Sequence, residues 1–285
     1  MDTAMPALFR LTGILRRAAL LCLLAATHTI AAEPLPLKLG IMPFNSPLAL
    51  IKTHQPLTAH LERALGRKII VHTSPDYFTH INQLLAGDFD LAITGPHFGA
   101  MAADKDMLLL YRYAIELQPI FVVRTDSAIH TAADLRGKTL ALSSRLSIAS
   151  IGGVKWLQDH GFLLARDFRV VEYNSHGAAV AAVTAGEADA AITTHTPLRQ
   201  IPEDIRARTR LLGSDINVPH VMTLAHARLG SRDIERIRKA LAEFPLTPAG
   251  QAFFRDTGYR GYVAVSPDDL EKLRPFIDLT VRMMR

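Results

Sequence analysis

The chain has 285 residues, of which 49% are hydrophobic and 21% are charged, and its formal net charge is +5. This length and composition allow a real hydrophobic core and exclude an intrinsically disordered chain. The charges are scattered rather than gathered in a basic stripe, so we expect no nucleic-acid partner. A mildly basic balance suits an anionic ligand.

The N-terminal segment is typical of a secretory signal peptide, which we place at residues 1–32. Three arginines precede a nine-residue apolar run, residues 18–26, and small residues follow up to Ala32. Nine apolar residues are too few to span a bilayer, and a buried N-terminal helix is the alternative. We expect cleavage after Ala32. This removes three arginines and one aspartate and leaves a net charge of +3.

The only cysteine, Cys22, lies inside this signal segment. Leu21 precedes it where a lipoprotein signal needs a small residue, so we expect no lipid anchor. A mature chain without thiols excludes disulfides, thiol catalysis and cysteine-ligated metals.

Short apolar strands alternate with helical patterns from Pro36 onward, which is typical of parallel α/β sheets. The first elements in chain order are a strand over residues 37–43, a helix over 55–66 and a strand over 68–74. The pattern continues to the end of the chain.

An internal repeat indicates two similarly built lobes. The stretch AGDFDLAIT, residues 86–94, returns as AGEADAAIT at residues 185–193. In each copy an apolar helix ends at a glycine, an acidic residue makes the turn, and a strand of small residues ends in threonine. The acidic residues of both copies are therefore interpreted as turn residues rather than as a paired-carboxylate site.

Two such lobes bring the carboxyl ends of their strands to a common cleft, where ligands bind in α/β sheets. The segments after the two repeats are therefore candidate site residues, namely Thr94, Gly95 and His97 in the first lobe and Thr194 and His195 in the second. Residues 117–127 and 218–227 have the extended pattern of strands that cross between the lobes. Two crossing strands predict a hinge.

The serine-rich stretch SSRLSIASIGG, residues 143–153, lies between an apolar strand and a helical pattern. A helix start exposes unpaired N–H groups and partial positive charge, both of which favour an oxyanion. Ser144 and Ser147 could add hydroxyl donors. The alternative is that Ser147 is an ordinary helix cap.

Two further candidates follow strands on the same predicted side. Tyr77 follows the second strand and could bind an oxygen of the ligand, although a surface turn is the alternative. His176 lies at a strand-to-helix junction, where an imidazole could donate to an oxyanion.

Motifs for catalysis and metal binding are missing from the sequence. It contains no GxSxG, P-loop or GxGxxG pattern, so we expect no enzyme activity and no cofactor. It also lacks HExxH or a close histidine pair, so any metal site would be assembled across loops, and we predict none.

The chain resembles the PhnD-like periplasmic binding proteins that serve phosphate, phosphite and phosphonate ABC transporters. The resemblance spans the mature chain. It rests on LGIMPFNSP, LTAHLERALGRKIIVHTSPDY, LLAGDFDLAITGP, TAADLRGKTLAL, SHGAAVAAVTAGEADAAIT and DTGYRGYVAVSPDDLEKLR.

This resemblance implies a type II periplasmic binding protein fold, an α/β fold in which two lobes close on a ligand about a two-strand hinge. It implies lobe 1 at residues 33–120, lobe 2 at 121–218, and a return crossing with the C-terminal part of lobe 1 at 219–285. It also implies that Ser147, Ile148, Ala149 and Ser150 form the anion cradle, and that His176 is the family's histidine.

The chain departs from the family pattern at this cradle. Ile148 and Ala149 stand where the family has hydroxyl residues, and Gly177 stands where an acidic residue commonly follows the histidine. The segment 193–196 supplies no carboxylate for an ammonium group. We therefore do not expect an aminoalkylphosphonate ligand.

The resulting expectation is a periplasmic, monomeric solute-binding protein that captures a small oxyanion for an ABC importer and its inner-membrane permease. The alternative is a sensory binding protein that passes a ligand signal to a membrane receptor kinase. A metal carrier or an enzyme on the same fold is the third possibility.

Overall fold

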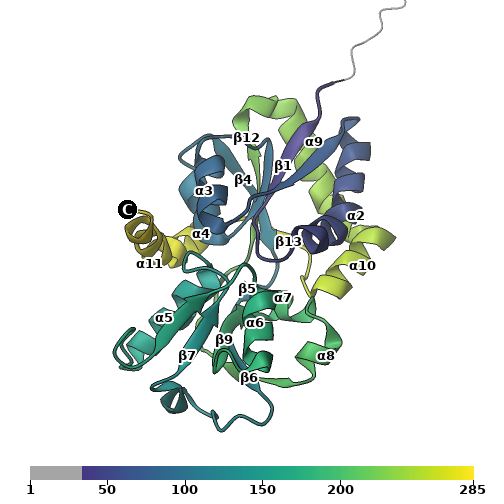
Figure 1. Ribbon diagram of the computed structural model, residues 1–285. Helices are drawn as coiled ribbons and strands as arrows, with labels where there is room; N and C mark the ends of the chain where they lie inside the picture. Colours follow the sequence, from purple (N-terminus) through teal and green to yellow (C-terminus); the bar gives the residue numbers. More distant parts are fainter. Residues whose placement is uncertain (1–33) are drawn as a thin grey trace, which may run out of the picture. The chain divides into compact units, whose positions relative to one another are not determined.

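The computed structural model describes residues 34–285, and the predicted signal peptide with Cys22 lies outside them. Strands from distant parts of the chain form two main sheets (Figure 1). The first sheet has the spatial order β13 (Tyr262–Val263), β4 (Met107–Tyr113), β12 (Met222–His226), β3 (Leu91–Thr94), β1 (Leu37–Ile41) and β2 (Ile69–Thr73). The second has the order β10 (Thr209–Gly213), β6 (Pro119–Arg124), β9 (Ala190–Thr194), β7 (Thr139–Leu142) and β8 (Arg169–Glu172).

Each sheet is covered by helices and forms one lobe. The helices of the first lobe are α2 (Pro47–Leu65), α3 (Tyr77–Leu85), α4 (Pro96–Ala102), α9 (Gly230–Glu243), α10 (Pro248–Thr257) and α11 (Pro267–Met284). The second lobe has α5 (Ile148–Asp159), α6 (His176–Ala185), α7 (His195–Arg199) and α8 (Glu203–Arg206). Short 3₁₀ helices cover Ala132–Leu135, Ala227–Leu229 and Phe244–Leu246. Within residues 34–285, no helix is both long and apolar enough to cross a membrane.

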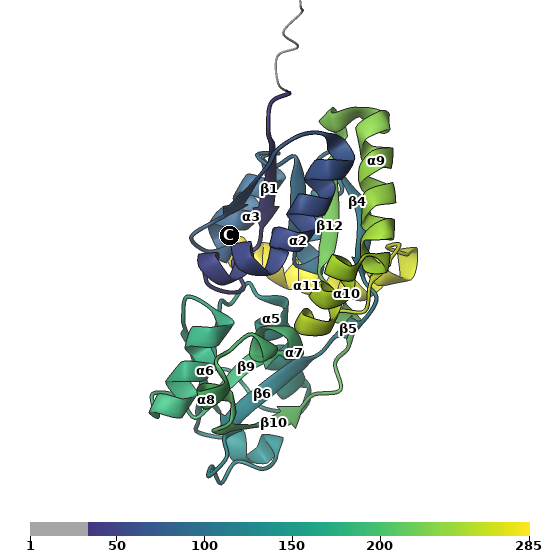
Figure 2. The same cartoon turned by 90° about the vertical axis from the view of Figure 1, so that its right-hand side faces the viewer.

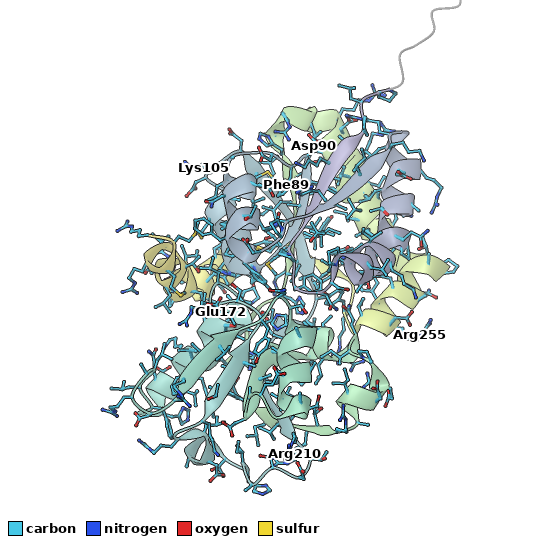
Figure 3. All side chains as sticks on the ribbon, viewed as in Figure 1. Phe89, Asp90, Lys105, Glu172, Arg210 and Arg255 are labelled. Atoms are coloured by element: carbon cyan, nitrogen blue, oxygen red, sulfur yellow. The ribbon has the colours of Figure 1, made fainter. Side chains whose placement is uncertain are left out.

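The sequence repeat corresponds to equivalent strands of the two lobes. β3 is parallel to β1 and antiparallel to β12, and β9 is parallel to β7 and antiparallel to β6. The aspartates of the repeats also match, since Asp90 accepts a hydrogen bond from the Lys38 N–H and Asp189 accepts one from the Thr139 N–H. Figure 3 shows Asp90 near one end of the first sheet, far from the junction of the lobes. These acidic residues join a turn to a strand start, as the sequence indicates.

The lobes are connected by two short strands, β5 (Glu116–Leu117) and β11 (Val218–Pro219), which pair antiparallel. The remaining parts of the predicted crossing segments continue into β6 and β12 of the two sheets. The two-strand hinge is therefore present, and it is shorter than the sequence pattern suggests. Both sheets and both crossings have the arrangement of a type II periplasmic binding fold.

Helix α2 differs from its prediction. It begins at Pro47, eight residues before the expected start, and Pro56 lies inside it. Proline is typical of the first helical turn, which made residue 55 look like the beginning. The actual N-cap is Ser46, whose hydroxyl accepts a hydrogen bond from the Ala49 N–H. Helices α2, α9 and α10 pack together on one side of the first sheet (Figure 2).

Apolar packing holds α5 and α6 on opposite faces of the second sheet. Phe121 and Ile192 pack with Leu157 of α5 on one face, whereas Val122 and Val180 of α6 pack together on the other. These helices begin at the carboxyl ends of β7 and β8. The fold therefore points both helix starts toward the first lobe.

Candidate ligand-binding site

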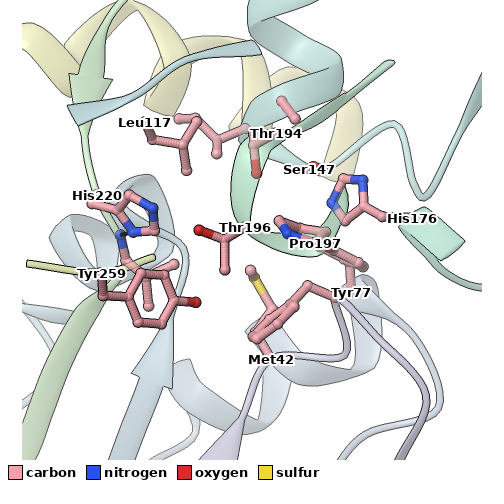
Figure 4. A pocket seen from close by; sticks show the side chains of 14 residues that line it. Met42, Tyr77, Leu117, Ser147, His176, Thr194, Thr196, Pro197, His220 and Tyr259 are labelled. Carbon is pink, nitrogen blue, oxygen red and sulfur yellow. Dashed lines mark hydrogen bonds between the residues drawn. The ribbon is translucent and has the colours of Figure 1, made fainter. Parts of the chain in front are cut away.

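The loops at the carboxyl ends of the strands line a partly open pocket between the lobes (Figure 4). Its walls come from the loop after β1, the starts of α3, α5 and α6, the end of β9, and the hinge. The lining residues are Met42, Phe44, Tyr77, Leu117, Ser147, Ile148, Ala149, His176, Thr194, Thr196, Pro197, His220, Val221 and Tyr259.

Six residues expected from the sequence line this pocket. They are Tyr77, Ser147, Ile148, Ala149, His176 and Thr194. They come from both lobes and from segments far apart in the chain. The remaining six expected residues lie outside the lining.

The first-lobe residues of this second group have other partners. Thr94 shares a hydrogen bond of 3.0 Å with Nε2 of His80, and the Gly95 N–H faces the sulfur of Met42. His97 donates from Nε2 to the Leu146 carbonyl at 2.9 Å. Because Leu146 belongs to the loop just before α5, this hydrogen bond connects the first lobe to the second.

The second-lobe residues of this group lie around the pocket rather than in it. The Ser144 hydroxyl accepts a hydrogen bond from the Leu146 N–H and borders a neighbouring, more open hollow. Ser150 is buried and faces a groove between α5 and α11. His195 contacts Oε1 of Gln118 at 3.3 Å.

At the start of α5, the side chain of Ser147 does not cap the helix. Ser147 is the N-cap residue, is 2% exposed, and makes no side-chain capping hydrogen bond. Its hydroxyl is therefore available to a ligand. The first N–H groups of α5, at Ile148 and Ala149, have no intrahelical acceptor and add partial positive charge beside this hydroxyl.

Tyr77 reaches the same region from the first lobe. Asp76 caps α3 by accepting a hydrogen bond from the Thr79 N–H, which places Tyr77 as the first helical residue. Burial raises the pKa of Tyr77 to about 12, with the hydroxyls of Ser143 and Ser147 opposing the shift. Neither hydroxyl completes a hydrogen bond of normal geometry to Tyr77, and no other described group does. Tyr77 is a neutral donor at pH 7.

His176 begins α6, which Ser175 caps through the Ala178 N–H. Its Nε2 contacts the Ser143 hydroxyl at 3.2 Å. Burial lowers the pKa of His176 to about 4, with the backbone of Ile192 opposing the shift. The ring is therefore neutral near pH 7 and contributes polarity without charge.

The sequence interpretation missed His220 and Tyr259 on the wall nearest the hinge, whereas Thr196 on the same wall ends the polar segment 193–196 that follows the second repeat. His220 follows β11, Tyr259 follows the glycine that ends α10, and Thr196 lies in α7. The ring of Tyr259 stacks on Tyr113 with centroids 3.8 Å apart. The sequence signal for His220 is its place directly after a crossing strand, whereas Tyr259 comes from a loop without a recognisable site pattern.

The lining contains no Asp, Glu, Lys or Arg side chain. Arg112, which lies close enough to influence His220, forms an ion pair with Asp269 at 2.9 Å. An anion in the pocket would therefore be held by neutral donors and the α5 start. Among residues 34–285, no group of three or more His, Cys, Asp or Glu side chains could hold a metal ion.

Comparison with known proteins agrees with this architecture. PhnD1 from Prochlorococcus marinus in complex with methylphosphonate has 15% identity and a TM-score of 0.77, over 88% of this chain and 100% of that chain. A phosphonate transporter binding protein, PA3383 of Pseudomonas aeruginosa, has 15% identity and a TM-score of 0.77, over 89% and 90%. XAC2383 from Xanthomonas citri bound to chloride has 18% identity and a TM-score of 0.70, over 87% and 98%.

These three structures share the fold of this chain. The family model for phosphonate periplasmic substrate-binding proteins of ABC transporters matches residues 39–270, which is most of the chain. The family consists of transporter binding proteins rather than enzymes, and it is periplasmic. The protein therefore belongs to the family of periplasmic substrate-binding proteins of phosphonate ABC transporters.

Proposed function

We propose that this protein, exported by its N-terminal signal, captures a small phosphonate- or sulfonate-type oxyanion between its lobes. It then delivers the ligand, as a monomer, to an inner-membrane ABC permease. The observation that carries the proposal is the uncapped start of α5, facing the buried, unpartnered hydroxyl of Tyr77. A tetrahedral oxyanion would complete the hydrogen bonds of both groups.

Further support comes from the position of the pocket. Ser147 and His176 belong to one lobe and Tyr77 to the other, so a ligand that contacts all three favours the closed state. The methylphosphonate bound by PhnD1 of Prochlorococcus is a ligand of this chemical type. Neither the described residues nor the matched family favours the sensory alternative, and transport is the role we propose.

A thermal-shift panel tests this function. Phosphate, phosphite, methylphosphonate, methanesulfonate, sulfate and acetate would each be added at the same ionic strength, with sodium chloride as the control. A ligand at about 100 times its Kd stabilises the folded state by about 2.7 kcal/mol, which corresponds to several degrees in Tm. We expect at least one phosphonate or sulfonate to give this shift. If none of the six raises Tm above the control, the proposed function is wrong.

A further inference from the structure

A second polar wall lies across the pocket from Ser147 and His176. His220, Tyr259 and Thr196 form it, and Figure 4 shows their polar atoms directed into the same space. This wall does not contribute to the α5 start that would hold an anionic head. It therefore faces whatever the ligand carries at its other end.

His220 is held in one tautomer and one orientation. Its Nδ1 accepts a hydrogen bond of 2.8 Å from the Val221 N–H, so the ring proton lies on Nε2. The rings of Tyr113 and Tyr259 pack against it edge-on, with centroids 5.6 and 5.0 Å away. Burial, with a smaller effect of Arg112, lowers the pKa of His220 to about 3, so the ring stays neutral. Among the described residues, the His220 Nε2–H donates no hydrogen bond.

The other groups along this wall limit which kind of ligand tail can bind beside it. The hydroxyls of Tyr259 and Thr196 can donate or accept, but no carboxylate lines the pocket to pair with an ammonium group. A buried cation without a partner is costly. A purely apolar tail would leave the His220 N–H unpaired, which is also unfavourable.

We propose that the ligand is an oxyanion whose short tail ends in a neutral oxygen, such as a hydroxyl or a carbonyl, which accepts a hydrogen bond from Nε2 of His220. This inference rests on the proposed function, because it takes the anionic head to lie at the α5 start. It makes His220 the residue that determines specificity for the tail.

Three phosphonates of nearly equal size separate the possible tails. Propylphosphonate, 2-hydroxyethylphosphonate and 2-aminoethylphosphonate end in a methyl, a hydroxyl and an ammonium group, and methylphosphonate presents the head alone. Calorimetric titration of the purified protein should show that the hydroxyl compound binds roughly tenfold more tightly than the propyl compound, which is the size of one net hydrogen bond. The ammonium compound should bind most weakly of the three.

Substitutions at His220 test whether this residue causes the preference for the hydroxyl compound over the propyl compound. In His220→Phe the ratio of the propyl to the hydroxyethyl Kd should fall from about ten to near one, because the donor is lost. His220→Gln keeps a neutral donor and should retain part of the ratio. It also provides a second variant if His220→Phe does not fold. Ser147→Ala is the matched control, since it should weaken both compounds and preserve their ratio.

The possible binding results distinguish a failure of the inference about His220 from a failure of the proposed function. If methylphosphonate binds but the three tails bind equally, or the ammonium compound binds most tightly, the inference about His220 is overturned and the proposed function stands. A ratio unchanged in both His220 variants overturns it as well. If none of the four phosphonates binds, phosphonate capture fails and the inference fails with it.

Discussion

Ser147 occupies the N-cap position of α5 without capping it, whereas Ser266 caps α11 in the usual way. The Ser266 hydroxyl accepts a hydrogen bond from the Asp269 N–H, and the Asp269 carboxylate accepts one from the Ser266 N–H. Two serines at the same helical position thus differ in whether the side chain caps the helix. The difference makes a matched pair of substitutions possible.

We predict that Ser147→Ala weakens methylphosphonate binding by roughly tenfold or more, because a hydrogen bond to a charged oxygen is lost. The free energy of unfolding without ligand should change by less than about 1 kcal/mol, since no capping bond is removed. Calorimetric titration and urea denaturation measure the two quantities.

Ser266→Ala is the control for this prediction. It should lower the free energy of unfolding by about 1 kcal/mol and leave the affinity unchanged, because Ser266 lies outside the pocket lining. If Ser147→Ala costs as much stability as Ser266→Ala and leaves binding intact, Ser147 is a structural cap.

Tyr77→Phe tests the buried hydroxyl of the first lobe. This hydroxyl has no completed hydrogen bond in the unliganded protein, so its removal should leave the free energy of unfolding unchanged or raise it by up to about 1 kcal/mol. Binding of methylphosphonate should weaken by roughly tenfold. Loss of stability together with unchanged affinity would show that the hydroxyl is structural.

At the scale of elements, two glycines set how closely α5 approaches the second sheet. A Cβ on Gly153 would lie 2.7 Å from Cγ2 of Ile192, and one on Gly152 would lie 2.7 Å from Pro119. Helix propensity alone favours alanine over glycine. The tight packing of α5 against β9 and β6 reverses this preference and fixes the position of the helix start at the pocket.

We predict that Gly153→Ala lowers the free energy of unfolding by about 1 kcal/mol or more, because the new methyl group overpacks against Ile192. Gly177→Ala in α6 is the matched control. Its Cβ would meet neighbours at 3.7 to 3.9 Å, so alanine should be neutral or stabilising. Urea denaturation of both variants measures this difference, and a stabilising Gly153→Ala would contradict the packing argument.

The elements themselves were largely predictable from the sequence. The repeat identified β3 and β9 as equivalent strands because turn glycines, acidic turn residues and small apolar residues are local signals. The start of α2 was not predictable, since Pro56 is a strong local start signal that tertiary packing overrides. The sequence predicts crossing strands longer than β5 and β11 because the apolar pattern continues into β6 and β12 without a break.

The candidate site was partly predictable for a related reason. Tyr77, Ser147 and His176 follow strands directly, so chain order alone places them at the cleft. His220 and Tyr259 reach the pocket only through the return of the chain across the hinge. His97 and Thr94 have the right place in the sequence, but their side chains turn toward Leu146 and His80 instead.

At the scale of the whole molecule, buried histidines link stability to pH. Burial lowers the pKa of each of five histidines to about 3 or 4, namely His54, His80, His97, His176 and His220. In the unfolded chain these groups titrate near 6.5. Between about pH 6.5 and 4 the unfolded state therefore binds more protons than the folded state.

We predict that the free energy of unfolding is flat between about pH 7.5 and 9, before unfolded tyrosines begin to ionise, and falls as the pH is lowered from about 6.5 toward 4. Each histidine contributes a slope of at most about 1.4 kcal/mol per pH unit. The aspartates with lowered pKa, Asp134, Asp167 and Asp269, begin to contribute only near pH 4, where unfolded aspartate titrates. Urea denaturation at pH 7, 6 and 5 isolates the histidines, and equal stability at the three values would contradict the prediction.

The central claim is that a small oxyanion binds between the lobes at the start of α5. A crystal structure of the purified protein with methylphosphonate tests it most directly. We predict that phosphonate oxygens lie about 2.7 to 3.0 Å from the Ser147 hydroxyl, the Tyr77 hydroxyl and the first N–H groups of α5. Methylphosphonate bound only elsewhere, such as in the groove between α5 and α11, or an empty pocket at saturating methylphosphonate, would contradict it.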